Sequence, residues 1–191
     1  GWYTEILANY IDKPGLLIAA HFDKDTNIPY FKRGRAAFEK KINTNPMYKN
    51  VEIVDLSSEL AKEGSIDAVL TFRNLHNWLG PQMDNIFSNT YKALKPGGIF
   101  GVVEHRANPG TSMEKMKKSG YVTEEHAIKV AEKHGFTLVS KSEINANPKD
   151  TKDYPRGVWT LPPSLRLKDK DKDKYLEIGE SDRMTLLFKK L

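Results

Sequence analysis

Six short apolar runs lie along the chain, each bordered by turn-forming or polar residues. They span 16–20, 51–54, 66–72, 99–103, 137–139 and 184–188. Uninterrupted apolar runs of this length are typical of strands that are buried on both faces of a sheet. The pattern therefore predicts six strands, and the run at 137–139 marks only the beginning of the fifth.

Segments with helical periodicity separate these strands, at 2–11, 34–42, 81–94 and 123–134. Thr123 is suited to cap the last of them, and Gly135 follows its end. In the segment 81–94, Pro81 suits the first turn, and the residues 95–98 end the helix and turn into the next strand. One stripe of this predicted helix collects Met83, Ile86, Phe87, Thr90, Tyr91 and Leu94.

The alternation of helices and strands predicts an α/β fold with a parallel sheet, formed by a single domain over residues 1–191. The stretch 145–182 has no clear period and is too long for an ordinary connection. We therefore expect a lid-like insertion or a partly disordered segment there. Within it, 168–174 alternates Lys and Asp, which predicts a solvated loop because the charges nearly cancel.

The amino-acid composition limits the classes of protein to which the chain can belong. The 191 residues suit one domain, and 39% hydrophobic with 29% charged residues excludes a wholly disordered chain. Cysteine is absent, which excludes disulfide scaffolds, cysteine nucleophiles and thiolate metal sites. No stretch approaches the roughly 18 apolar residues of a membrane-spanning helix. The net charge of +5, from 30 basic and 25 acidic residues, does not favour nucleic acid as a partner.

Polar and titratable residues gather directly after the predicted strands. In doubly wound sheets, ligands bind outside the carboxyl ends of the strands. We therefore expect a ligand site at this edge of the sheet. The residues in these positions are His21 and Asp23, Asp55 and Leu56, Arg73, Asn74 and His76, and Glu104 and His105.

Several segments, which together cover nearly the whole chain, resemble class I S-adenosylmethionine-dependent methyltransferases. Residues 1–7 resemble the end of the glycine-rich first motif, and 65–70 resemble the fourth strand of that family. The most specific match is Leu94-Lys95-Pro96-Gly97-Gly98, which resembles the family's LKPGG turn. Residues 71–78, 104–106 and 179–183 further resemble an uncharacterised bacterial subgroup of methyltransferases.

The resemblance implies a Rossmann-like, doubly wound and mostly parallel sheet whose last strand, at 184–188, runs antiparallel. In the family, a first strand and two motif glycines lie before the position of Gly1, so we expect an N-terminally incomplete domain. The family places an acidic residue where this chain has His21, with Asp23 two residues further on. We expect a cytoplasmic protein, or a periplasmic or secreted one if a leader precedes Gly1.

The resemblance also implies S-adenosylmethionine as the cofactor. Its carboxylate is expected near the helix start, its ribose and adenine at the next two strand ends, and its amino-acid end beside residues 73–74. From the residues alone, Asp55 is equally suited to cap a turn at 57–61. A surface ion pair is the alternative for Arg73, and its place directly after an apolar strand favours the site over that alternative. The candidate cofactor residues are Gly1, Tyr3, His21, Asp23, Asp55, Leu56, Arg73 and Asn74.

Methyl transfer needs a base only when the acceptor must first lose a proton. His76 and His105 are the candidates, because imidazole titrates near neutral pH, and Glu104 is placed to orient one of them. For either histidine taken alone, the residue pattern favours a structural role over a catalytic one. The three residue types suit a metal, but no tight spacing supports one, so we expect none. Aromatic residues that suit an acceptor pocket, or simply a core, are Tyr3, Trp78 and Trp159.

The sequence thus predicts methyl transfer from S-adenosylmethionine to a small-molecule acceptor. Two alternatives stay open. One is a methyltransferase-like binding protein without catalysis, which the histidine at position 21 favours. The other is a nicotinamide-nucleotide oxidoreductase, although the first glycine motif that it needs is missing. The sequence does not indicate the acceptor or the oligomeric state.

Overall fold

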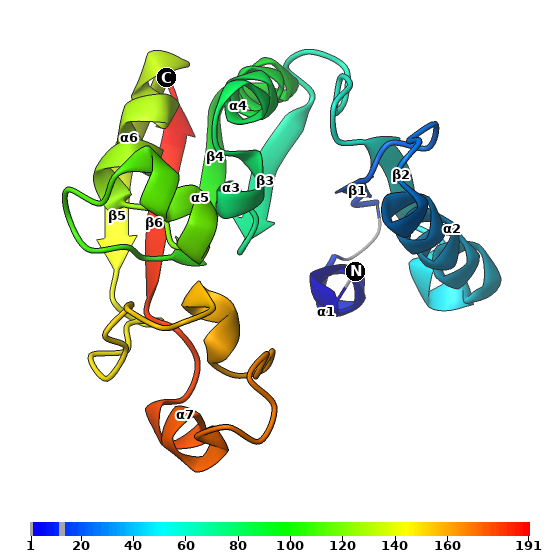
Figure 1. Ribbon diagram of the computed structural model, residues 1–191. Helices are drawn as coiled ribbons and strands as arrows, with labels where there is room; N and C mark the ends of the chain where they lie inside the picture. Colours follow the sequence, from blue (N-terminus) through cyan, green and yellow to red (C-terminus); the bar gives the residue numbers. More distant parts are fainter. Residues whose placement is uncertain (1, 12–13) are drawn as a thin grey trace. The chain divides into compact units, whose positions relative to one another are not determined.

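The computed structural model describes residues 2–11 and 14–191. The chain divides into two compact units, Gly1–Lys62 and Glu63–Leu191 (Figure 1).

The first unit is built on two parallel strands, with Leu17 opposite Val51 and His21 opposite Asp55. Its small core is formed by Phe38, Ile42 and Tyr48, against which residues of the strands pack. The carboxyl ends of both strands therefore lie at the same edge. The elements are α1 (Trp2–Tyr10), β1 (Leu17–His21), α2 (Pro29–Thr44), η1 (Pro46–Tyr48) and β2 (Val51–Asp55).

Helix α2 begins five residues earlier than the predicted segment 34–42. Ile28 before it is extended, and Pro29 occupies the first turn, where its fixed φ angle suits a helix and its missing N–H costs nothing. The apolar pattern of the first turns is weak, and Tyr30 there is exposed, so the sequence did not reveal this earlier start of the helix.

The second unit holds a four-stranded sheet in the order β3-β4-β6-β5. β3 and β4 are parallel, and β6 runs antiparallel to both of its neighbours. The predicted antiparallel last strand is confirmed. The elements are β3 (Ile66–Phe72), α3 (Leu75–Trp78), α4 (Pro81–Ala93), β4 (Leu94–His105), α5 (Met113–Ser119), α6 (Glu124–Lys133), β5 (Phe136–Ser142), η2 (Gly157–Thr160), α7 (Lys172–Ile178) and β6 (Arg183–Lys190).

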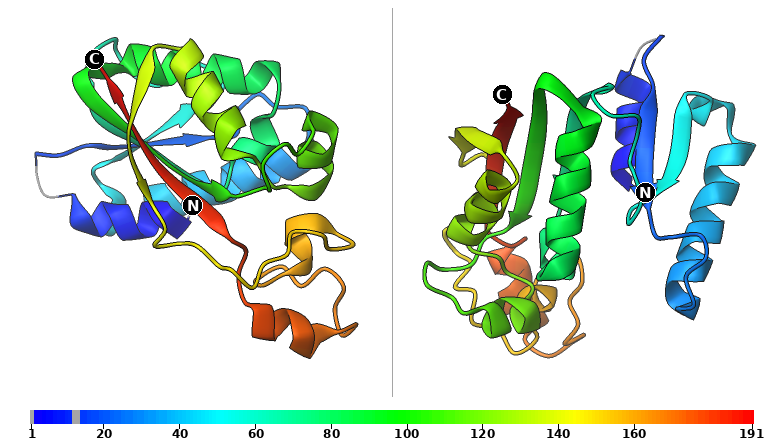
Figure 2. Two further views of the ribbon diagram at one scale, coloured as in Figure 1. Left: turned by 90° about the vertical axis from the view of Figure 1, so that its left-hand side faces the viewer. Right: turned by 90° about the horizontal axis from the view of Figure 1, so that it is seen from above.

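The core of the second unit lies between this sheet and the helices α4 and α6, which cover one of its faces (Figure 2). Alternate residues of β4 and β6, such as Phe100, Val102 and Leu186, are buried on this face. The opposite face is less buried than the uninterrupted apolar runs predicted, and Leu70 there is 44% exposed. A shallow groove of about 310 Å³ follows this face between Leu70 and Leu187.

The segment 95–98, predicted as a turn, is accommodated at the start of β4. Ile66 pairs with Leu94 but Ala68 pairs with Ile99, so the intervening residues bulge out of the register. Gly97 has a φ of 80°, which favours glycine. A Cβ atom on Gly98 would lie 2.9 Å from a backbone oxygen, so both glycines are needed for this tight entry into the strand.

The stretch 145–182 belongs to the second unit and contains η2 and α7. Leu161 and Tyr175 are buried, which gives the segment a packed interior. The prediction of a solvated loop at 168–174 is wrong for its last residues, because α7 begins at Lys172. The reason is that Tyr175 buries its ring and fixes the helix, which the Lys/Asp alternation alone does not reveal.

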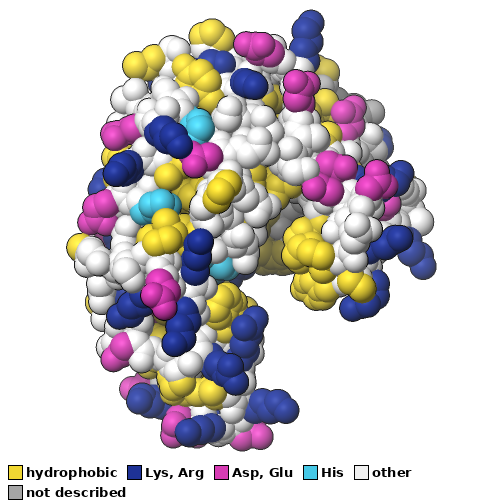
Figure 3. All heavy atoms as spheres, turned by 45° about the horizontal axis from the view of Figure 1, so that its top comes forward, with side chains coloured by type: hydrophobic (Ala, Val, Ile, Leu, Met, Phe, Trp, Pro, Cys, Tyr) yellow, Lys and Arg dark blue, Asp and Glu magenta, His cyan; other side chains and the backbone are white. Residues whose placement is uncertain are grey.

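Basic and acidic side chains are interspersed over the face of the molecule in Figure 3, as the mixed composition suggests. Among the described residues, no helix has the length and apolar character needed to cross a membrane.

Candidate functional site

Glu104, at the end of β4, is the buried centre of a polar cluster in the second unit. Strand alternation places it on the same face as Phe100 and Val102, so its carboxylate is 0% exposed. Its oxygens accept hydrogen bonds from the backbone N–H of His105 (2.7 Å) and of His76 (3.2 Å). Nδ1 of the His76 ring lies 3.0 Å from Oε1 of Glu104. The carboxylate therefore fixes both the backbone and the ring of His76.

His76 is well placed for this contact because it lies in the first turn of the short helix α3, where backbone N–H groups lack helical partners. Its side chain is 8% exposed. The ring also contacts the edge of Trp159, with 5.8 Å between the ring centres. Glu104 and Trp159 together hold the imidazole in one orientation.

His105, the last residue of β4, completes the cluster. Its ring centre lies 5.4 Å from that of His76, and its Nδ1 lies 2.5 Å from Oγ of Ser181. Burial, together with the nearby His76, Arg73 and Arg183 side chains, lowers the pKa of His105 to about 3. His105 is therefore neutral at physiological pH.

Arg73 and Asn74 connect β3 to α3 beside this cluster. Arg73 has a φ of 56°, unusual for a residue with a side chain, and its N–H donates to the carbonyl of Val103 at 2.7 Å. The Asn74 amide donates to the carbonyl of Phe72 at 3.3 Å. Of the aromatic candidates in this unit, Trp159 contacts His76, whereas Trp78 is buried in the core.

The residue types of this cluster are ones that bind metals, and one donor atom of each of His76, Glu104 and His105 lies within 4.8 Å of the others. Both Glu104 oxygens, however, already accept hydrogen bonds, one of them from the His76 ring. A cation between them would have to displace that hydrogen bond. The arrangement is better suited to holding and moving a proton.

In the first unit, His21 and Leu56 lie together where β1 and β2 end. The N–H of Leu56 donates to the carbonyl of His21 at 2.9 Å. The His21 ring stacks on Phe38, with centres 4.6 Å apart, and burial lowers its pKa. Its Nδ1 is buried and has no hydrogen-bond partner among the described residues. A buried polar atom of this kind calls for a partner.

Asp23 and Asp55 join the two loops that follow these strands. Asp55 Oδ1 accepts from Arg35 at 2.7 Å and from the backbone N–H of Lys24 at 3.2 Å. Asp23 accepts from the N–H and the hydroxyl of Ser57 at 3.2 and 2.6 Å. The Asp55 side chain therefore binds Arg35 and Lys24 rather than capping the turn at 57–61. Tyr3 lies half-buried in α1, and Gly1 falls outside the described residues.

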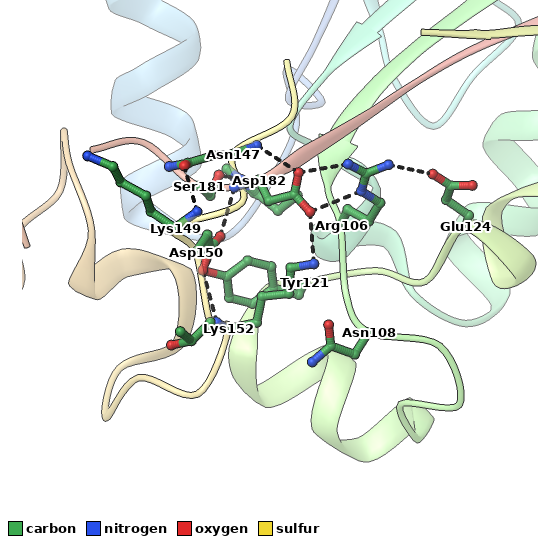
Figure 4. A network of polar contacts seen from close by, with 12 residues as sticks. Arg106, Asn108, Tyr121, Glu124, Asn147, Lys149, Asp150, Lys152, Ser181 and Asp182 are labelled. Atoms are coloured by element: carbon green, nitrogen blue, oxygen red, sulfur yellow. Dashed lines mark hydrogen bonds and ion pairs between the residues drawn. The ribbon is translucent and has the colours of Figure 1, made fainter. Parts of the chain in front are cut away.

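A second polar network, which sequence reasoning missed, holds the residue beside His105 in place (Figure 4). Arg106 binds both oxygens of Asp182, at 3.0 and 2.8 Å, and also binds Glu124 at 3.0 Å. Burial alone would raise the pKa of Asp182, but the hydrogen bonds from Arg106 and Lys152 outweigh it and lower the pKa to about 2.

Asp150 extends this network toward the stretch 145–182. It accepts from the hydroxyl of Tyr121 at 3.0 Å and from the N–H of Asp182 at 2.7 Å. Burial, together with the Asp150 charge, raises the pKa of Tyr121. These bonds fix the chain at Ser181, directly before Asp182, and so place its hydroxyl against His105. The segment 179–183 carried part of the family resemblance, but nothing in it indicated these roles.

No protein-family model matches the chain, and no curated protein matches it. Solved structures of similar fold include geranyl diphosphate C-methyltransferase from Streptomyces coelicolor A3(2), with a TM-score of 0.57 and 11% identity over 100% of this chain and 77% of that one. A SAM-dependent methyltransferase from Aquifex aeolicus gives 0.56 and 12%, over 100% and 77%. Another from Methanosarcina mazei gives 0.54 and 11%, over 97% of each chain. The chain has the Rossmann-like fold of these methyltransferases, which confirms the predicted fold class.

Proposed function

We propose that the chain transfers a methyl group from S-adenosylmethionine to a small-molecule acceptor. The fold supports this proposal, and neighbours of that fold are described as methyltransferases, one of them in complex with S-adenosyl-L-homocysteine and geranyl diphosphate. The observation that carries it is the contact between His76 and Glu104. It provides an oriented base at the carboxyl end of the sheet, where this fold class binds its ligands.

The residues of the first unit fit the proposed cofactor. The buried Nδ1 of His21 lacks a partner, and a ribose hydroxyl would supply one. Asp55 and Leu56 are the groups proposed for the adenine. When bound, S-adenosylmethionine supplies a methyl carbon attached to a positively charged sulfur, a good leaving group.

The roles of the second unit follow from its hydrogen bonds. The carboxylate of Glu104 only accepts, so the Nδ1–H of His76 donates to it and Nε2 keeps a free electron pair. Nε2 takes the proton that the acceptor releases, and Glu104 stabilises the imidazolium that results. His76 is the proposed catalytic base, Glu104 its positioning residue, and neutral His105 a hydrogen-bonding partner of the acceptor.

Isothermal titration of the 191-residue chain with S-adenosylmethionine and S-adenosylhomocysteine tests the cofactor. We expect both to bind, and we expect His21→Ala to weaken both about tenfold, the loss of one hydrogen bond. His134→Ala is the matched control, since its ring contacts Asp84 on the surface of the second unit.

Absence of heat with both ligands would contradict the proposal. Binding of reduced nicotinamide adenine dinucleotide instead of S-adenosylmethionine and S-adenosylhomocysteine would favour the oxidoreductase. Binding without transfer to any acceptor would favour a methyltransferase-like binding protein.

A further inference from the structure

The ring proton of His76 has a fixed place. Its Nδ1 lies 3.0 Å from an oxygen of Glu104, whose two oxygens accept three N–H groups in all. An ionised carboxylate has no proton to donate, so the hydrogen bond requires a proton on Nδ1. Nε2 of His76 is consequently a hydrogen-bond acceptor.

The contact with Ser181 determines which ring nitrogen of His105 carries the proton. Its side chain is buried, and its Oγ has one hydrogen-bond partner within the described part of the chain, Nδ1 of His105 at 2.5 Å. A buried hydroxyl proton without an acceptor is energetically unfavourable. The hydroxyl of Ser181 therefore donates to Nδ1, and the single ring proton of neutral His105 resides on Nε2, which becomes a donor.

Both Nε2 atoms are available to a ligand. Neither nitrogen makes a hydrogen bond within the described residues. The buried ring nitrogens without a partner in that part of the chain are Nδ1 of His21 and Nε2 of His126, so neither of these two Nε2 atoms is a fully buried, unpaired nitrogen. The ring centres of His76 and His105 are 5.4 Å apart. The two rings are therefore close enough for one small polar group to contact both.

We infer that His76 and His105 form a complementary acceptor–donor pair that selects a hydroxyl group as the methyl acceptor, and that Ser181 is the positioning residue that sets the tautomer of His105. The inference rests on the proposed function, whose acceptor chemistry it specifies. A hydroxyl donates its proton to Nε2 of His76, and its oxygen accepts from Nε2–H of His105.

Other acceptor groups fit this pair less well. An ether has no proton for His76. An amine nitrogen has a single electron pair, which cannot both accept from His105 and attack a methyl group. A hydroxyl oxygen has two pairs, so one accepts the hydrogen bond while the other stays free.

Nitrogen-15 NMR of the full chain, labelled at histidine, tests the tautomers without any cofactor or acceptor. We expect His76 to carry its proton on Nδ1 and His105 on Nε2. Ser181→Ala should abolish the single tautomer of His105 and leave that of His76 unchanged, whereas Ser181→Thr, which keeps the hydroxyl, should restore it. The matched control is Ser112→Ala, since Ser112 caps α5 on the surface.

A proton on Nδ1 of His105 in the unmodified chain would overturn the inference, and this measurement needs no variant. Loss of both signals on addition of Zn²⁺, with recovery in EDTA, would also overturn it and favour a cation site.

Ligand-observed NMR with phenol and anisole tests the selection. Phenol offers both a donor and an acceptor, whereas anisole lacks the hydroxyl proton, so we expect phenol to bind about tenfold more tightly, the value of one hydrogen bond. The preference should be lost in Ser181→Ala and kept in Ser112→Ala. Equal binding of the two probes would overturn the inference. If the tautomers and the preference hold but S-adenosylmethionine does not bind, the proposed function fails and the hydroxyl-binding pair stands.

Discussion

Asp182→Asn removes one negative charge from the network that holds Ser181 and leaves the shape of the side chain nearly unchanged. Asp182 binds Arg106 through both oxygens, and Lys152 lies 2.8 Å from one of them. Its side chain is 6% exposed. An amide retains some of these hydrogen bonds but cannot balance the two positive charges. We therefore expect a large loss of stability at neutral pH.

The magnitude follows from the pKa of Asp182, which is about 2 in the folded chain and about 3.9 in an unfolded one. A difference of about two units corresponds to roughly 2–3 kcal/mol of unfolding free energy at pH 7. Because the folded pKa is the lower one, this contribution is complete above pH 4 and is lost as the pH falls toward 2. At pH 3 roughly half of it should remain.

Urea unfolding followed by tryptophan fluorescence measures this difference. In a Trp2→Phe background, the remaining tryptophans, Trp78 and Trp159, both report on the second unit. Glu143→Gln is the matched control, since Glu143 binds the same Arg106 but is 64% exposed. We expect its cost to stay below about 1 kcal/mol.

The reasoning fails if Asp182→Asn costs no more than Glu143→Gln. It also fails if the difference between Asp182→Asn and the unmodified chain stays the same from pH 7 to pH 3, because the cost would then come from packing rather than from charge.

Three further predictions concern the second unit. Gly110 and Gly120 have φ angles of 74° and 75°, but only a Cβ atom at position 120 would meet Trp159, at 3.0 Å. In urea unfolding, Gly110→Ala should lower the unfolding free energy by about 1 kcal/mol and Gly120→Ala by at least about 2 kcal/mol. Equal losses for the two variants would contradict this prediction. Phe100→Ala, at a position 1% exposed, should cost about 3–5 kcal/mol in thermal unfolding, and a loss below about 1 kcal/mol would refute its place in the core. The ring of His105 should stay neutral down to about pH 4 in a proton NMR titration. Because its pKa in the folded chain is below the unfolded value, His105 should lower the unfolding free energy as the pH falls below about 6.5, and His105→Gln should remove this pH dependence.

The strands were predictable because buried strands consist of uninterrupted apolar runs, which are visible in the sequence. The run 66–72 coincides with β3, and each of the others overlaps a strand. Helices α3 and α5, with four and seven residues, were missed because so few turns do not establish a period. Tertiary contacts, not periodicity, fix such short helices.

The candidate site was predictable only in part. The rule that ligands bind at strand ends selected Glu104, His105 and the residues after β3, and the structure brings His76, Glu104 and His105 together. Ser181 contacts His105 from 76 residues further along the chain, and no local pattern reports a contact of that separation. The roles of Asp150 and Asp182 depend in the same way on how the stretch 145–182 folds back.

The most direct test of the account is a mass-spectrometric assay for anisole and S-adenosylhomocysteine, formed when the full chain is incubated with S-adenosylmethionine and excess phenol. We predict that both products form in equal amounts, and that His76→Gln lowers their rate about 100-fold or more while S-adenosylmethionine still binds. Equal rates for His76→Gln and the unmodified chain, or no product from the unmodified chain, would contradict the claim that His76 is the base of a hydroxyl methyltransferase.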